Sequence, residues 1–186
     1  MRLFITIGLT HYIDMEKIIT IENKNVLLRT TAGVLIHYKQ QFGRDYNDDY
    51  SDLKDLINDK DSYTQKFAEV GFGLLWAMAR TADKSIELPS VWLKGVGGVA
   101  LLRAIIEASE LFSAALSVVD SKSSDSGGKK FSVEALIAEA LICGLSIDDL
   151  DDMPLPMVLG TIEEWCRLKG YSEDVKEADQ EDFDSF

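Results

Sequence analysis

Residues 17–42 read KIITIENKNVLLRTTAGVLIHYKQQF and combine two β-type runs with a helical run. The runs Lys17–Glu22 and Val26–Thr30 are partly alternating, contain many β-branched residues and are separated by three polar residues, which predicts a β-hairpin. After the hairpin, apolar residues follow helical spacing: Val34, Leu35, Tyr38 and Phe42. This change of pattern predicts a small sheet followed by helices.

The limits of this N-terminal unit are set by local signals. The Thr30–Thr31 pair supplies a candidate helix cap, and Gly43 is expected to end the helix. Leu3–Ile7 can add a third strand to the hairpin. The sequence is equally compatible with a natural chain that starts at Met15, and in that case residues 1–14 are an upstream extension.

Further helical segments are expected between the first helix and residue 119. A short one follows an acidic stretch, Ser62 can cap a longer one, Pro89–Ser90 opens a turn of helix, and one long helix is expected from about Gly98 to Val119. The apolar positions of the first two are Leu53, Leu56, Ile57, Phe67, Leu74, Leu75, Trp76 and Met78. The predicted fold class is therefore α+β and predominantly α-helical, with a small N-terminal β-hairpin or sheet and a helical bundle.

Composition divides the rest of the chain. Residues 120–130, DSKSSDSGGKK, lack large apolar side chains and predict a flexible linker between an upstream domain of residues 15–119 and a downstream domain of residues 131–170. Residues 171–186 carry seven acidic residues and one basic residue, which predicts a disordered acidic tail.

The downstream domain is expected to be short and helical. The first helix is expected to begin at Ser132 and to end at Gly144. Ser146 caps a short turn, and the last helix is expected to begin near Pro154 or Pro156 and to end at Gly170. Three short helices bury too little apolar surface to be robustly stable alone, so we expect them to dock on another surface.

The charge and the cysteine content narrow the function classes. The 186 residues include 32 acidic and 19 basic side chains, giving a formal charge of −13, which disfavours binding to nucleic acid phosphates. The apolar run at Met1–Leu9 is too short to span a bilayer, so we expect no membrane association and a cytoplasmic location. Cys143 and Cys166 lack metal-ligand spacing and are expected to be reduced and packed.

No motif predicts a reactive centre. The Asp45–Asp49 stretch resembles the start of a calcium loop, but its continuation lacks the required Gly and bidentate Glu, which favours a solvated acidic turn. The Gly95–Gly98 stretch lacks the context of a phosphate loop, and His37 is expected to be a partly buried structural residue. The acidic run Asp148–Asp152 is expected to lie at helix starts rather than to bind a metal. We therefore expect no catalytic, cofactor-binding or metal-binding residues and a role in binding other proteins.

Three segments carry a family resemblance. They are IENKNVLLRTTAGVLIHYKQQFGRDY (21–46), FAEVGFGLLWAMARTADKSIELPSVWL (67–93) and ALIAEALICGLSIDDLDDMPLPMVLGTIEEW (135–165). Together with the expected long helix between the last two, this layout resembles the tail assembly chaperones of long-tailed bacteriophages. The resemblance covers residues 16–170.

The resemblance implies a non-enzymatic chaperone in the cytoplasm of a bacterial host that is absent from the finished virion. In that family the upstream domain coats the tape measure protein, and a downstream domain, appended by programmed ribosomal frameshifting, recruits the tail tube protein. Self-association into a homo-oligomer is also implied. No cofactor, nucleic acid or membrane is implied as a partner.

Apolar residues of the predicted helices are the candidate partner-binding positions. Each one is also a candidate for the core, and periodicity alone does not separate the two roles. The candidates are Trp76, Met78, Trp92, Leu102, Ile106, Leu136, Ile137, Leu145, Leu159, Ile162 and Trp165. An alternative function is an acidic helical inhibitor or DNA mimic that occupies a nucleic-acid-binding protein, although the carboxylates cluster in turns and in the tail.

Overall fold

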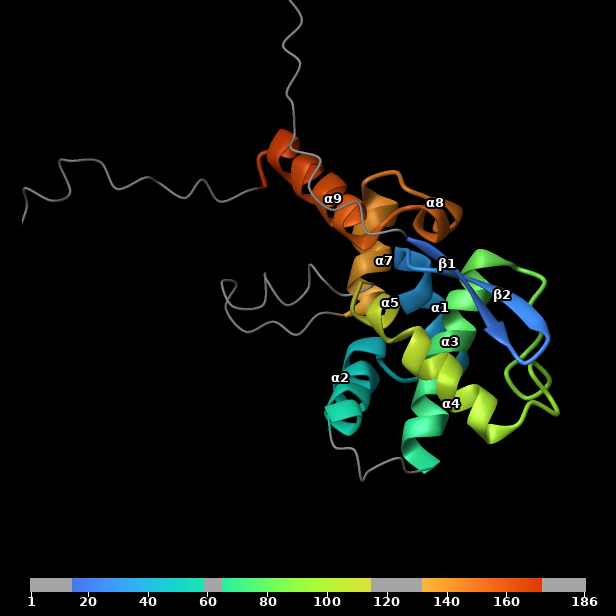
Figure 1. Cartoon of the computed structure of the whole chain (residues 1–186). Helices are drawn as coiled ribbons and strands as arrows, with labels where there is room; N and C mark the ends of the chain where they lie inside the picture. The colour runs from blue at the N-terminus through green and yellow to red at the C-terminus, as the bar shows by residue number, and fades with distance from the viewer. Residues whose placement is uncertain (1–14, 59–64, 115–131, 172–186) are drawn as a thin grey trace, which may run out of the picture.

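A computed structural model describes residues 15–58, 65–114 and 132–171 of the chain. A two-stranded sheet packs beside a group of helices (Figure 1), which confirms the predicted α+β, predominantly α-helical fold. The described elements are β1 (Glu16–Ile21), β2 (Lys24–Arg29), α1 (Ala32–Phe42), α2 (Tyr46–Asn58), α3 (Gln65–Ala82), α4 (Gly98–Glu107), α5 (Ser109–Ala114), α7 (Val133–Ile142), α8 (Ile147–Asp152) and α9 (Leu155–Lys169). The predicted strand Leu3–Ile7, the cap Ser62, the linker 120–130 and the tail beyond Tyr171 lie outside the described residues.

The hairpin is antiparallel, and the turn between its strands is shorter than predicted. Its register runs from Glu16 opposite Arg29 to Ile21 opposite Lys24, so the turn consists of Glu22 and Asn23. Glu22 adopts a φ of 55° to close this turn. Alternate side chains along the strands form the buried face that packs on the helices: Ile19, Ile21, Val26 and Leu28.

Helix α3 forms the centre of the core. Eleven of its eighteen residues are buried, and it packs against α1, α2, α4 and β2. Two glycines permit close approach on different sides, because Gly71 lies against the side chain of Ile105 and Gly73 lies against the ring of Tyr38. Phe42 contacts the ring of Trp76 edge-on at a centroid distance of 5.8 Å.

The long helix predicted from Gly98 to Val119 is interrupted within its described part. Helix α4 ends at Glu107, Ala108 adopts a φ of −87° and a ψ of −3°, and α5 begins at Ser109. Ile105 before the break, Ala108 at the break and Phe112 after it are all buried. The prediction of one continuous helix was wrong here because side-chain periodicity continues through a local change of direction.

The acidic stretch after Gly43 is also different from the prediction. Helix α2 already begins at Tyr46, and Asp49 is 8% exposed rather than solvated. The Tyr38 hydroxyl donates a hydrogen bond to Asp49, and the Arg44 Nε atom lies 3.0 Å from the same carboxylate. Burial, followed by the hydrogen bond to Asp49, raises the pKa of Tyr38, which keeps this hydroxyl a donor.

We expect Asp49→Ala to lower the free energy of unfolding by about 1–3 kcal/mol, because it leaves the buried Tyr38 hydroxyl without its acceptor. Urea denaturation monitored by circular dichroism measures this effect. Asp55→Ala is the matched control on the exposed face of α2 and is expected to change stability by less than about 0.5 kcal/mol. Equal effects of the two substitutions would show that Asp49 is not a structural acceptor.

The C-terminal helices have the predicted local caps. The Ser132 hydroxyl accepts a hydrogen bond from the Ala135 N–H at 3.3 Å, Ser146 and Asp149 form a capping box, and Gly170 ends α9 with a φ of 74°. Buried residues of α7, α8 and α9 join the same hydrophobic core as the N-terminal elements. The expected docking surface is therefore the upstream part of this chain, mainly α1.

Candidate functional site

The structure divides the predicted partner-binding residues into core and surface. The side chains of five candidates are buried and belong to the core: Trp76, Met78, Trp92, Leu136 and Ile162. Five others are half-buried: Leu102, Ile137, Leu145, Leu159 and Trp165. Ile106 is exposed, with 51% of its surface accessible. The accessible part of the predicted site therefore centres on α4 and the C-terminal helices.

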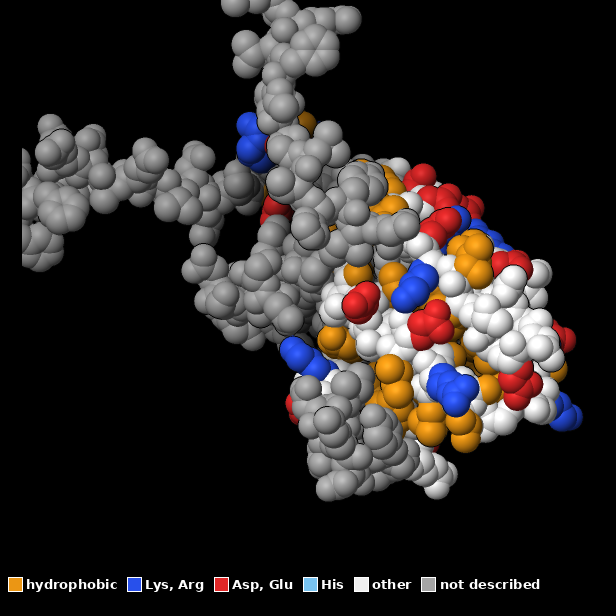
Figure 2. Space-filling view, in the orientation of Figure 1, with side chains coloured by type: hydrophobic (Ala, Val, Ile, Leu, Met, Phe, Trp, Pro, Cys, Tyr) orange, Lys and Arg blue, Asp and Glu red, His pale blue; other side chains and the backbone are white. Residues whose placement is uncertain are grey.

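Helix α4 presents an apolar face to solvent. Val99 is 67% exposed and lies on the same face as Leu102 and Ile106, at steps of three and four residues. The opposite face carries Ala104 and Ile105, which are buried. We call Val99, Leu102 and Ile106 the α4 surface. Figure 2 shows hydrophobic side chains gathered over α4, with charged side chains between them.

A second set of exposed apolar residues lies on the C-terminal helices, and sequence reasoning missed it. These residues are Leu141, Ile142, Met157 and Leu168, and their exposed fractions range from 50% to 70%. The signal for α7 was present, because eight of the ten residues in VEALIAEALI are apolar and a ten-residue helix at the edge of a domain buries only one side. We call these four residues the C-terminal surface.

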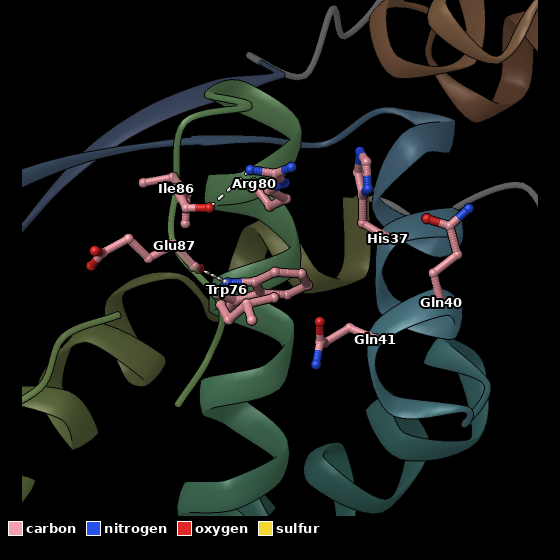
Figure 3. Close-up of a pocket in the computed structure, with 8 residues that line it drawn as sticks. His37, Gln40, Gln41, Trp76, Arg80, Ile86 and Glu87 are labelled. Carbon is pink, nitrogen blue, oxygen red and sulfur yellow. Dashed lines mark hydrogen bonds between the residues drawn. The ribbon is translucent and has the colours of Figure 1, made fainter. Parts of the chain in front are cut away.

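A groove of about 450 Å³ lies between α1, α3 and the segment that follows α3. In Figure 3, side chains from α1 and α3 face one another across it. The Trp76 Nε1–H donates to the Glu87 carbonyl oxygen at 2.8 Å, and Arg80 donates to the carbonyl oxygens of Ile86, at 2.9 Å, and Lys84. The lining residues are His37, Gln40, Gln41, Trp76, Arg80, Ile86, Glu87 and Leu88.

The groove offers hydrogen bonding and apolar contact. Gln40 and Gln41 are exposed and carry amide groups that can donate and accept hydrogen bonds. Leu88 is 62% exposed at the opposite wall. The groove therefore offers both amide groups and an exposed apolar side chain to a bound molecule.

His37 connects the groove to the C-terminal helices. Its Nε2 atom lies 3.0 Å from the Asp151 Oδ1 atom on α8. Burial lowers the pKa of His37 below its usual value of 6.5, and the nearby Asp151 carboxylate opposes this shift. The sequence predicts a structural role for His37 but carries no signal for its partner, which is 114 residues away.

The described residues contain no group of three or more His, Cys, Asp or Glu side chains placed to hold a metal ion. Cys143 and Cys166 are both free and partly buried. In the same described part, no helix has the length and apolar character needed to cross a membrane.

Comparisons with protein-family models, with curated proteins and with solved structures found no match to this chain.

Proposed function

We propose that this protein is a non-enzymatic tail assembly chaperone that binds the tape measure protein of a long-tailed bacteriophage and recruits the tail tube protein. The main support is the α4 surface, an apolar face left exposed by a helix that buries Ala104 and Ile105 on its other side. The partners come from the sequence resemblance. The site of action would be the host cytoplasm during tail assembly.

The α4 surface suits a helical client with an apolar stripe. Its three side chains follow the spacing that one helix presents to another, and exposed charged residues, Arg103 and Glu107, lie beside them. Covering such a stripe on a client removes apolar area from water on both proteins. A long client with repeated apolar stripes would otherwise aggregate through the same surfaces.

The experiment compares two matched substitutions in the full chain, Ile106→Asp on the α4 surface and Leu168→Asp on the C-terminal surface. Both side chains are more than half exposed, so neither change is expected to unfold the protein. We expect Ile106→Asp to weaken binding of the tape measure protein about tenfold or more, because it removes apolar contact and buries a charge. We expect Leu168→Asp to weaken binding of the tail tube protein instead.

Co-expression of each variant with each tail protein, followed by affinity capture and by sedimentation of aggregated tape measure protein, measures both effects. Undiminished capture of the tape measure protein by Ile106→Asp would contradict the α4 surface as the client site. Capture of a basic nucleic-acid-binding protein, together with no capture of either tail protein, would favour the acidic mimic over the chaperone.

A further inference from the structure

The contact between the N-terminal part and the C-terminal helices is strongly polarised in charge. Each ion pair that joins residues 15–114 to residues 132–171 has its basic group on the N-terminal part and its carboxylate on the C-terminal helices. The pairs are Arg29–Asp152 at 2.9 Å, Lys39–Glu134 at 3.6 Å, Lys84–Asp148 at 2.7 Å and Lys84–Asp151 at 3.1 Å. The His37 Nε2 atom also lies 3.0 Å from Asp151 and forms an ion pair only when His37 is protonated.

The centre of this contact is an end-to-end junction of two helices. The predicted N-cap residue Thr31 makes no side-chain capping bond; its hydroxyl donates to the Asp151 carbonyl oxygen at 2.7 Å. The Ala32 N–H donates to the Met153 carbonyl oxygen at 3.0 Å. The C-terminal end of α8 thus supplies acceptors to the N-terminal end of α1, and the two helix dipoles attract each other.

Gly33 makes the junction possible. A Cβ atom at this position would lie 2.9 Å from the Asp151 Cα atom and would also overlap its carboxylate. The main chain of α8 would have to move to accept it. Asp151 itself is 4% exposed, so α8 covers this end of α1 closely.

We propose that α7, α8 and α9 form an acidic module that docks reversibly on a basic surface of the N-terminal part, and that salt weakens this docking. Call this basic surface, formed by Arg29, Lys39 and Lys84, the docking surface. Charge-complementary contacts of this kind weaken as ionic strength rises, because exposed ion pairs are screened. Release would leave the two parts joined by the chain and expose the first turn of α1. The proposal does not depend on the identity of any partner protein.

His37 adds little charge to this contact near neutral pH. Burial lowers its pKa, the Asp151 carboxylate opposes this shift, and Arg80 and Lys84 add to it. The charge attraction therefore comes from the arginine and lysine side chains.

Hydrogen exchange measured by mass spectrometry on the full chain tests the proposal, with Gly33→Ala compared with Gly160→Ala. Gly160 lies on α9, and a Cβ atom there meets nothing within 4 Å. We expect Gly33→Ala to speed exchange about tenfold or more in the first turn of α1 and in α8, while the buried amides of α3 keep their protection. Gly160→Ala is expected to leave all three regions unchanged.

A further measurement tests the contribution of charge. Raising NaCl from 0.05 M to about 0.5 M is expected to speed exchange in α8 but not in α3. The proposal is overturned if α8 and α3 lose protection together under these conditions, or if Gly33→Ala leaves α8 protected.

Discussion

Trp76→Ala is expected to lower the free energy of unfolding by about 3–5 kcal/mol, the range for loss of a large buried aromatic side chain. Trp76 is 4% exposed although it borders the groove, and its ring packs edge-on against Phe42. Its indole N–H also holds the Glu87 carbonyl oxygen at 2.8 Å. The substitution would therefore leave a cavity between α1 and α3 and free the segment that closes the groove.

Urea denaturation followed by circular dichroism measures the loss, and Trp165→Ala is the matched control. Trp165 is half-buried on α9 and stacks on Tyr171, which is 72% exposed, at a centroid distance of 6.0 Å. Because its surroundings are open, the control is expected to cost about 1 kcal/mol. A similar small loss in both variants would show that Trp76 is a surface residue, as a direct role in partner binding would require.

Local sequence signals predicted the parts of the fold that local interactions determine. The hairpin, the end of α1 at Gly43, the capping serines Ser132 and Ser146 and the end of α9 at Gly170 all follow from side chains within a few residues. Glycine at the last of these positions supplies a positive φ that other residues rarely adopt. Such signals do not depend on contacts with distant parts of the chain.

The errors arose where a distant residue decides the outcome. The Thr31 hydroxyl bonds to α8 instead of its own helix, and Asp49 is buried because Tyr38 and Arg44 reach it. The same limit affects the candidate site. Met78 and Ile106 are both apolar residues at helical positions, yet Met78 is fully buried by neighbouring elements and Ile106 is not. Periodicity identifies an apolar face, whereas burial depends on which element packs against it.

The packing of α3 on α4 gives the second large expected effect. Ile105 is fully buried, and three of its side-chain atoms would lie 2.7–2.9 Å from a Cβ atom at Gly71. Gly71→Ala is therefore expected to cost about 1–3 kcal/mol through overpacking, and Ile105→Ala about 2–5 kcal/mol through a cavity. The Gly71 substitution adds volume and the Ile105 substitution removes it, and both changes occur in the same space.

The double variant Gly71→Ala, Ile105→Ala should therefore be more stable than the sum of the single effects predicts, by about 0.5–3 kcal/mol. Urea midpoints of the four proteins, analysed with the slope of each transition, complete the cycle. Gly98→Ala is the control for the glycine substitution, since a Cβ atom there meets nothing within 4 Å. Strict additivity would mean that the Gly71 methyl group and Ile105 do not share one packing site, and α4 would then have to be held against α3 by its other buried residues. A positive coupling would instead show that Gly71 and Ile105 form one packing site between α3 and α4, on the helix that leaves Val99 and Ile106 exposed to solvent.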